Sequence, residues 1–221
     1  MAEIIIQQSL LADNEYVKKP TKKDTIVIHH TAGGHHPVWT VNSWGRDNRG
    51  RIATAYTIGS RSITNGDSSV DGLIVMAFDP KYWAWHLGVK GTNGVLDAKS
   101  IGIEICNYGP IKLGKDGKYY NWVNKPVPAS EVYDLGFLWR GYRYFHRYTD
   151  AQIESLRHLL LFLSQEYGID IRANQPWSAA SFETSKTALS GAPGLWTHVN
   201  YRKDKSDCHP QPELIAMLNS L

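Results

Sequence analysis

The sequence has few cysteines, no long apolar run and little excess charge, and each shortage excludes a class of protein. Two cysteines among 221 residues, Cys106 and Cys208, are too few for a disulfide-stapled scaffold. No segment approaches the roughly 20 apolar residues of a membrane-spanning helix, so we expect no membrane span. The 24 Lys and Arg residues exceed the 21 Asp and Glu residues by too little for a dedicated nucleic-acid binder.

The chain also lacks the segments that divide or export many proteins. No stretch rich in Pro, Gly, Ser or charge is long enough for a linker, so we expect a single domain over residues 1–221. The N-terminal MAEIIIQQSLLADNEY has no basic region followed by a long apolar run, which favours cytoplasmic synthesis without a Sec signal. A protein of this kind that acts outside the cytoplasm needs another factor to carry it there.

Hydrophobic periodicity predicts several strands and helices. Short β-branched or apolar runs predict strands at residues 25–30, 53–59, 73–78 and 100–107. Helical spacing and helix-boundary residues predict helices from Pro37 to about Arg46, from the capping-box threonine Thr149 to Gly168, and from Pro212 onward.

Residues 108–148 are rich in Gly, Lys and Tyr and show no clear period, which predicts an elaborated surface insertion. The segment ends in WRGYRYFHRY, where aromatic and basic residues alternate. Such a pattern is typical of a surface that stacks on nucleic acid, or of a lining for a sugar–peptide cleft. An edge strand with a solvated face gives the same pattern, and the sequence leaves these alternatives open.

The segment SIGIEI separates two faces of a predicted strand. Ile101, Ile103 and Ile105 share one face, because side chains alternate along an extended backbone. Glu104, the only acid in the strand, projects from the opposite face. We therefore expect the isoleucine face to pack inward and Glu104 to face a site, with a surface ion pair as the competing interpretation.

Residues of types that can bind a metal occur in two segments that lie far apart in the sequence. His29 ends the first predicted strand, and THVNYRKDKSDCHP near the C-terminus carries His198, Asp207 and Cys208. A zinc hydrolase needs about three protein ligands and an open position for water. A lone histidine is more often packed or solvated than a ligand, so composition alone does not identify the ligands.

Four motifs occur in the order typical of one enzyme family. The segments IVIHHTAG, AWHLG, SIGIEI and TH followed by RKDKSD resemble the zinc-dependent N-acetylmuramoyl-L-alanine amidases. That family includes phage lysozyme-type amidases, peptidoglycan recognition proteins and muropeptide-recycling amidases. The resemblance runs from about Thr25 to Leu221 and leaves residues 108–148 unmatched. It implies a mixed α/β fold with a central mixed β-sheet flanked by helices and Zn²⁺ in a surface cleft.

The resemblance implies that His29 and His198 are zinc ligands. His30 would point away from the metal, toward packing or a supporting hydrogen bond. The family's third ligand, an Asp or a Cys, stands two residues after a lysine, which selects Lys205 and Asp207.

Cys208 keeps the third ligand open, because it adjoins Asp207 and thiolate binds zinc well. If the backbone is locally extended, Asp207 faces the same side as Lys205 and Cys208 faces away. This spacing favours Asp207.

The resemblance also implies the catalytic and substrate-binding residues. Glu104 would accept the proton of the attacking water and return it to the leaving amine, while Lys205 would stabilise the oxyanion. Some relatives place a tyrosine near the metal; Thr54 stands at that position and is not a base, which leaves the role to Glu104. His86 and its neighbour Trp85 are expected beside the substrate.

The function implied is hydrolysis of the amide between the muramic-acid lactyl group and the L-Ala of the peptidoglycan stem peptide. Without a wall-binding module, the chain resembles a phage endolysin that reaches the wall during host lysis. A recycling amidase or an antibacterial effector would leave the same signature, and a non-catalytic peptidoglycan-binding module is the competing class. We expect a monomer whose partner is peptidoglycan or a muropeptide and not nucleic acid.

Overall fold

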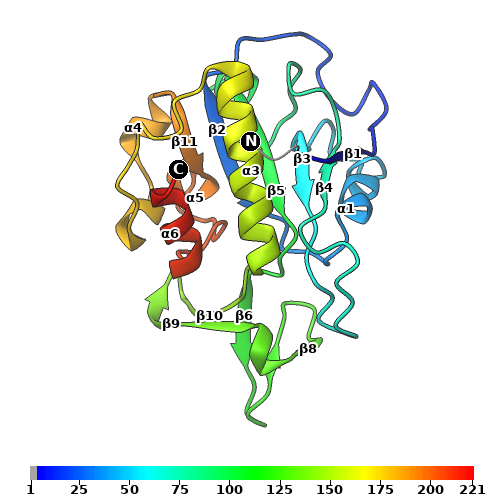
Figure 1. Ribbon diagram of the computed structural model, residues 1–221, viewed down its shortest axis with the longest axis vertical. Helices are drawn as coiled ribbons and strands as arrows, with labels where there is room; N and C mark the ends of the chain where they lie inside the picture. Colours follow the sequence, from blue (N-terminus) through cyan, green and yellow to red (C-terminus); the bar gives the residue numbers. More distant parts are fainter. Residues whose placement is uncertain (1–3) are drawn as a thin grey trace.

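The computed structural model describes residues 4–221, so the first three residues of the N-terminal segment discussed above lie outside it. The chain forms two β-sheets flanked by helices (Figure 1). The central sheet has the strand order β1-β4-β3-β5-β2-β11. These strands are β1 (Ile6–Gln8), β2 (Thr25–His30), β3 (Tyr56–Ile58), β4 (Ile74–Met76), β5 (Ser100–Ile105) and β11 (Gly194–Thr197).

The central sheet is mixed, as the resemblance implied. Strands β3 and β4 pair antiparallel, and the other neighbouring strands pair parallel. The sequences TIVIHH and SIGIEI are apolar and β-branched, which suits β2 and β5 to the middle of a sheet that is covered on both faces. Parallel pairing brings the carboxyl ends of β5, β2 and β11 to the same edge of the sheet.

Helix α3 (Asp150–Tyr167) crosses one face of the central sheet, and α6 (Pro212–Asn219) packs beside it (Figure 1). The predicted capping box is present: Thr149 Oγ1 accepts from the Gln152 amide, and Gln152 Oε1 accepts from the Thr149 amide. Gly168 ends the helix in the left-handed conformation. The apolar stripe of α3 is buried in the same core as the isoleucines of β2 and β5. This stripe consists of Ile153, Leu156, Leu159, Leu160 and Leu163.

Shorter helices occupy the rest of the molecule. A second apolar cluster packs Val27, which faces away from the isoleucines of β2, against residues of α2, α4 and α5. The remaining helices are α1 (Pro37–Trp44), α2 (Val95–Lys99), η1 (Ala129–Glu131), η2 (Ala179–Phe182), α4 (Lys186–Leu189) and α5 (His198–Tyr201). Within residues 4–221, no helix combines the length and apolarity needed to cross a membrane.

Residues 108–148, expected as a surface insertion, contain a second sheet that is antiparallel and lies at the lower end of the molecule in Figure 1. Its strand order is β8-β7-β6-β10-β9. The strands are β6 (Pro110–Leu113), β7 (Tyr119–Tyr120), β8 (Pro126–Val127), β9 (Val132–Trp139) and β10 (Tyr142–His146). The edge-strand interpretation of WRGYRYFHRY is wrong for β10, which pairs with β6 on one side and β9 on the other.

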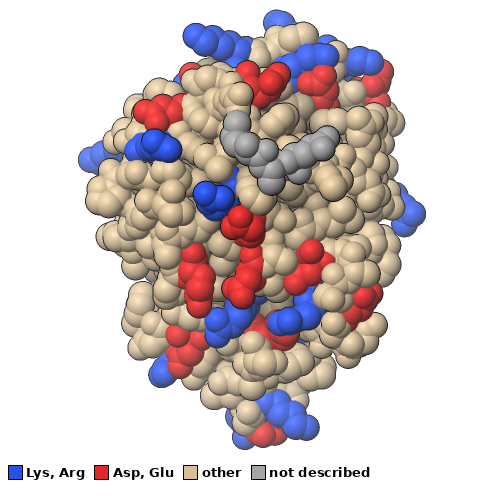
Figure 2. Space-filling view, viewed as in Figure 1, with Lys and Arg blue, Asp and Glu red and all other residues tan. Residues whose placement is uncertain are grey.

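Charges of both signs mix on the surface. Figure 2 shows Lys and Arg interspersed with Asp and Glu over the face that carries α3, in keeping with the net charge of +3. The arginines of WRGYRYFHRY also lie next to acidic residues: Arg140, Arg143 and Arg147 each pair with a carboxylate. Paired guanidinium groups are a poor electrostatic footprint for a phosphate backbone, which argues against the nucleic-acid interpretation of this segment.

Candidate active site

A cleft of about 340 Å³ lies at the carboxyl ends of β2 and β5. Open α/β sheets place ligands at this edge, where loops leave the strands. The cleft brings together the residues that the sequence predicted for the site, which come from widely separated segments: His29, Thr54, Trp85, His86, Glu104, His198, Lys205 and Asp207.

Three buried groups converge in this cleft with the geometry of a metal site. The Nδ1 atoms of His29 and His198 lie 3.0 Å apart. Asp207 Oδ2 lies 2.8 Å from His198 Nδ1 and 3.3 Å from His29 Nδ1. Tetrahedral zinc with bonds near 2.0 Å sets its donors about 3.3 Å apart. The triangle formed by His29 Nδ1, His198 Nδ1 and Asp207 Oδ2 therefore has about the size of one face of a zinc coordination tetrahedron.

The hydrogen bond at the far side of His198 fixes its tautomer. Nε2 of this ring lies 3.0 Å from the carbonyl oxygen of Leu87, which only accepts. Nε2 therefore carries the proton, and the lone pair of Nδ1 faces His29 and Asp207.

A chain of hydrogen bonds fixes His29 in the same way. Ser100 Oγ donates to the Leu96 carbonyl oxygen at 2.8 Å and so accepts from His86 Nε2, also at 2.8 Å. His86 Nδ1 is then free to accept from His29 Nε2, 2.9 Å away. His29 consequently presents an unprotonated Nδ1 to the centre of the triangle. His86 thus lines the cleft and also supports a predicted ligand.

The charge states of His29 and Asp207 suit metal binding, which requires neutral imidazole and ionised carboxylate. Burial lowers the pKa of His29 well below its usual value, and repulsion from His198 adds to this effect. Burial raises the pKa of Asp207, but the adjacent His198 and His29 outweigh burial and hold that pKa well below its usual range. At neutral pH the His29 imidazole is therefore neutral and the Asp207 carboxylate ionised, as metal binding requires.

Glu104 faces the cleft from β5, opposite the isoleucines that pack into the core. Burial raises the pKa of its carboxyl group well above the usual range; Asp207 raises it further and Lys205 opposes the shift. Within residues 4–221, Glu104 forms no ion pair, and its Oε2 is buried without a hydrogen-bond partner. The surface ion-pair interpretation is therefore wrong.

The other predicted residues line the walls of the cleft. Lys205 lies in the loop after α5. Thr54 precedes β3 and donates its hydroxyl to the Tyr56 carbonyl oxygen at 3.0 Å. Trp85 is 37% exposed and meets Trp83 edge-on, with ring centroids 5.3 Å apart.

The neighbours of the predicted ligands point away from the triangle. His30 Nδ1 lies 2.9 Å from the Tyr148 hydroxyl, in the core, as expected for the residue after His29. Cys208 is fully buried in the main apolar cluster, where burial raises the pKa of its thiol well above the usual value. Among the described residues, Asp207 and not Cys208 lies with the two histidines.

Sequence reasoning missed the wall formed by α1 and the loop after it. Trp44 and Arg49 line both the cleft and an adjoining hollow of about 320 Å³, which also contains Glu104 and Trp39. Trp39 and Trp44, in the predicted helix that follows the IVIHHTAGG loop, were the available signal, because a helix that follows such a loop borders the same site.

Comparisons with solved structures support the fold. The chain resembles PlyL (14% identity, TM-score 0.52, covering 92% of this chain and 86% of PlyL) and a mutant endolysin from Bacillus subtilis (15%, 0.51, covering 93% and 90%). It also resembles the hydrolase AmiA from Staphylococcus aureus, solved with its ligand (13%, 0.52, covering 99% and 83%). These identities establish similarity of fold alone.

Sequence comparison identifies the family. No curated protein sequence matches this chain. The family described as N-acetylmuramoyl-L-alanine amidase matches residues 19–210, which include every strand of the two sheets except β1 and every residue of the cleft named above. The chain therefore belongs to the N-acetylmuramoyl-L-alanine amidase family.

Proposed function

We propose that the protein is a zinc-dependent N-acetylmuramoyl-L-alanine amidase that cuts between the muramic-acid lactyl group and the L-Ala of the stem peptide. Membership of the family supports amidase activity on peptidoglycan. The observation that carries the zinc dependence is the convergence of His29, His198 and Asp207, with every donor distance between 2.8 and 3.3 Å.

Different residues of the cleft have different roles in hydrolysis. His29, His198 and Asp207 would hold zinc, which acidifies water and polarises the scissile carbonyl when bound. Glu104 accepts the proton of the attacking water and delivers it to the leaving amine. Its unpartnered Oε2 supports this role, because no group of the described residues 4–221 competes for that oxygen. Lys205 places a positive charge where the oxyanion develops.

The walls of the cleft would orient ligand and substrate. The hydrogen bonds of His86 to His29 and Ser100 favour an orienting role for this ring over direct substrate contact. Trp85 offers an exposed aromatic face to the sugar–peptide substrate. Thr54 supplies shape and no proton transfer, since its hydroxyl donates to the backbone.

We further propose that residues 1–221 act as one monomeric catalytic domain and that the biological role is that of an endolysin. Fold similarity to an endolysin from Bacillus subtilis supports this role. A recycling amidase and an antibacterial effector share the chemistry. A non-catalytic binding module is less favoured, because the chain has the complete donor set together with Glu104 and Lys205.

Digestion of purified cell wall tests the proposal. Mass spectrometry should find new lactyl carboxylates and free amino groups on L-Ala, and metal analysis should find one zinc per chain. Chelation should abolish hydrolysis and added zinc should restore it. Full activity in verified metal-free protein would reject the zinc dependence, and wall binding without new termini would establish a binding module. Faster cleavage of soluble fragments than of intact wall would favour a recycling enzyme.

A further inference from the structure

We propose that Arg140, in the turn between β9 and β10, is a positioning residue for the metal site. Its guanidinium group holds the backbone of residues 198–207, the segment that carries His198, Lys205 and Asp207. The inference rests on the proposed zinc site. It assigns a function to the second sheet, which lies outside the motifs that resemble the amidase family.

The guanidinium group binds three carbonyl oxygens of that segment. Nη1 of Arg140 donates to the carbonyl oxygens of Lys203 at 2.5 Å and Arg202 at 3.3 Å. Nη2 donates to the Val199 carbonyl oxygen at 3.4 Å and to a carboxylate oxygen of Glu183 at 3.1 Å. The side chain is only 8% exposed, so these contacts form in a partly dry environment where charge-assisted hydrogen bonds are strong.

The segment needs such support because it turns back on itself. His198 begins α5, residues 202–207 follow outside any helix or strand, and Asp207 returns to within 2.8 Å of His198. Internal backbone bonds include Val199 N to Asp207 O at 3.0 Å and Lys205 N to Arg202 O at 3.3 Å. The carbonyl groups at the end of a helix lack partners within the helix. Arg140 supplies such a partner to Val199 of α5 and binds the carbonyl oxygens of Arg202 and Lys203, which follow the helix.

The backbone of Arg140 supports a role for its side chain. Arg140 and Gly141 form the two-residue connection between Trp139 and Tyr142, with φ angles of 53° and 83°. Turns of this kind favour Asn-Gly, because both central residues are left-handed. Arginine is thus an unfavourable residue for the turn, and its hydrogen bonds to residues 199–203 provide the compensating stabilisation. Trp139 anchors the same hairpin end through its Nε1, which donates to Glu183 at 3.0 Å.

Replacement of Arg140 by asparagine separates the two roles of the residue. Arg140→Asn creates the preferred Asn-Gly turn and removes the guanidinium group, so the hairpin keeps its shape. We expect zinc affinity, measured by competition with a chromogenic chelator, to fall about 10- to 100-fold, the usual loss when a group supporting metal ligands is removed. Arg140→Lys, which keeps one donor group, should restore part of the affinity. At saturating zinc, KM should stay within about twofold while kcat falls, because Arg140 does not line the cleft.

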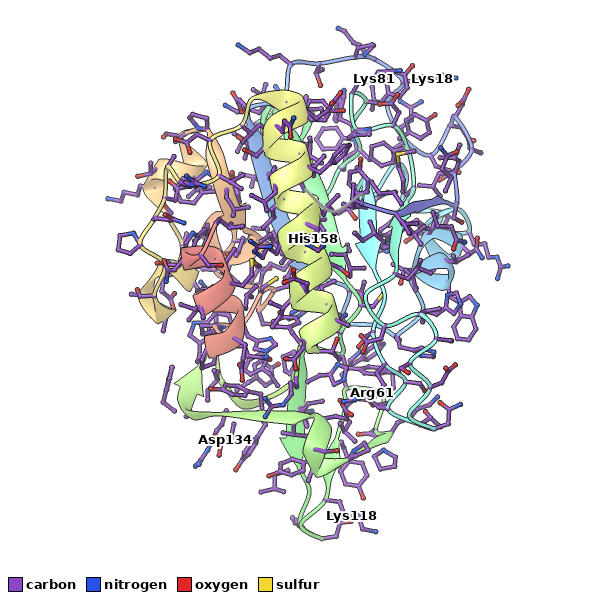
Figure 3. The ribbon with its side chains drawn as sticks, in the orientation of Figure 1. Lys18, Arg61, Lys81, Lys118, Asp134 and His158 are labelled. Atoms are coloured by element: carbon purple, nitrogen blue, oxygen red, sulfur yellow. The ribbon has the colours of Figure 1, made fainter. Side chains whose placement is uncertain are left out.

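Arg143→Asn is the matched control. Arg143 lies in the same hairpin and pairs with the exposed Asp134, labelled in Figure 3 on the second sheet; within residues 4–221 it forms no hydrogen bond or ion pair with residues 198–207. The zinc affinity of the Arg143→Asn variant should equal that of the wild type. Wild-type affinity in a folded Arg140→Asn protein would overturn the inference. If that variant fails to fold, Arg140→Lys decides, since undiminished affinity there would also overturn it. Failure of the wild type itself to bind zinc would instead reject the proposed zinc site.

Discussion

Glu104 of β5 lies directly beside His29 of β2, its partner in the parallel register of the two strands. Partners in parallel strands point to the same face of the sheet, so the carboxylate and the imidazole enter the same cleft. The isoleucines on either side of Glu104 face the opposite way, into the core under α3. Strand register thereby places the proposed proton acceptor next to a proposed zinc ligand.

Glu104→Gln should retain zinc and the fold while kcat falls about 10²- to 10⁴-fold, because the amide keeps the shape of the carboxylate but does not accept the proton. Metal analysis and the rate of wall hydrolysis check this expectation. Glu166→Gln, an exposed change at the end of α3, is the control and should have no effect. A near-normal kcat for Glu104→Gln would assign Glu104 a structural role.

Lys205→Ala should lower kcat about 10²- to 10³-fold without loss of zinc, because the oxyanion loses a preorganised positive charge. Lys203→Ala removes an exposed lysine from the same loop and should leave the rate unchanged. Equal rates for the two variants would show that the charge of Lys205 does not act on the reaction.

Asp207→Ala should abolish both zinc binding and hydrolysis, because it removes a carboxylate oxygen 2.8 Å from His198 Nδ1. Cys208→Ser should keep both, at the cost of some stability, since it places a hydroxyl group in the apolar core. Metal analysis of the two purified variants distinguishes the ligands. The reverse pattern would transfer the ligand role to Cys208.

His146→Asn should flatten the loss of stability in acid. Burial lowers the pKa of His146 to about 3 from an ordinary 6.5, so below pH 6.5 the unfolded chain binds a proton that the folded chain refuses. Stability is therefore lost as the pH falls from 6.5 toward 3. Asparagine does not titrate, and its side-chain oxygen can replace Nδ1 as acceptor for the Tyr108 amide, now 3.2 Å away.

Urea unfolding of metal-free protein at pH 7.5 and pH 4.5 measures this effect. Between these conditions the wild type should lose about 2 to 3 kcal/mol more than His146→Asn. The buried histidines that do not interact with His146 contribute equally to both proteins and cancel in the comparison. Equal losses in the two proteins would contradict the shifted pKa of His146.

The sequence by itself determined the elements whose signal is local. The helix after Thr149 was predictable to its ends, because its cap, its apolar stripe and the terminating Gly168 lie within one short stretch of chain. The opposite orientations of Ile103 and Glu104 followed from the two-residue period of a strand. The family and the candidate residues of the cleft could be predicted from the order of the motifs, since each motif is a contiguous segment.

Only the tertiary structure decided which distant groups meet. The short strands of residues 108–148 have little periodicity of their own, and their pairing into a second sheet depends on contacts between strands. Local alternation favoured Asp207 over Cys208, but the burial of Cys208 in the core became visible only in the packed molecule. The hydrogen bonds from Arg140 to residues 199–203 likewise have no counterpart in the sequence pattern. Periodicity specifies the face on which a side chain lies, whereas packing and chain closure determine what that face meets.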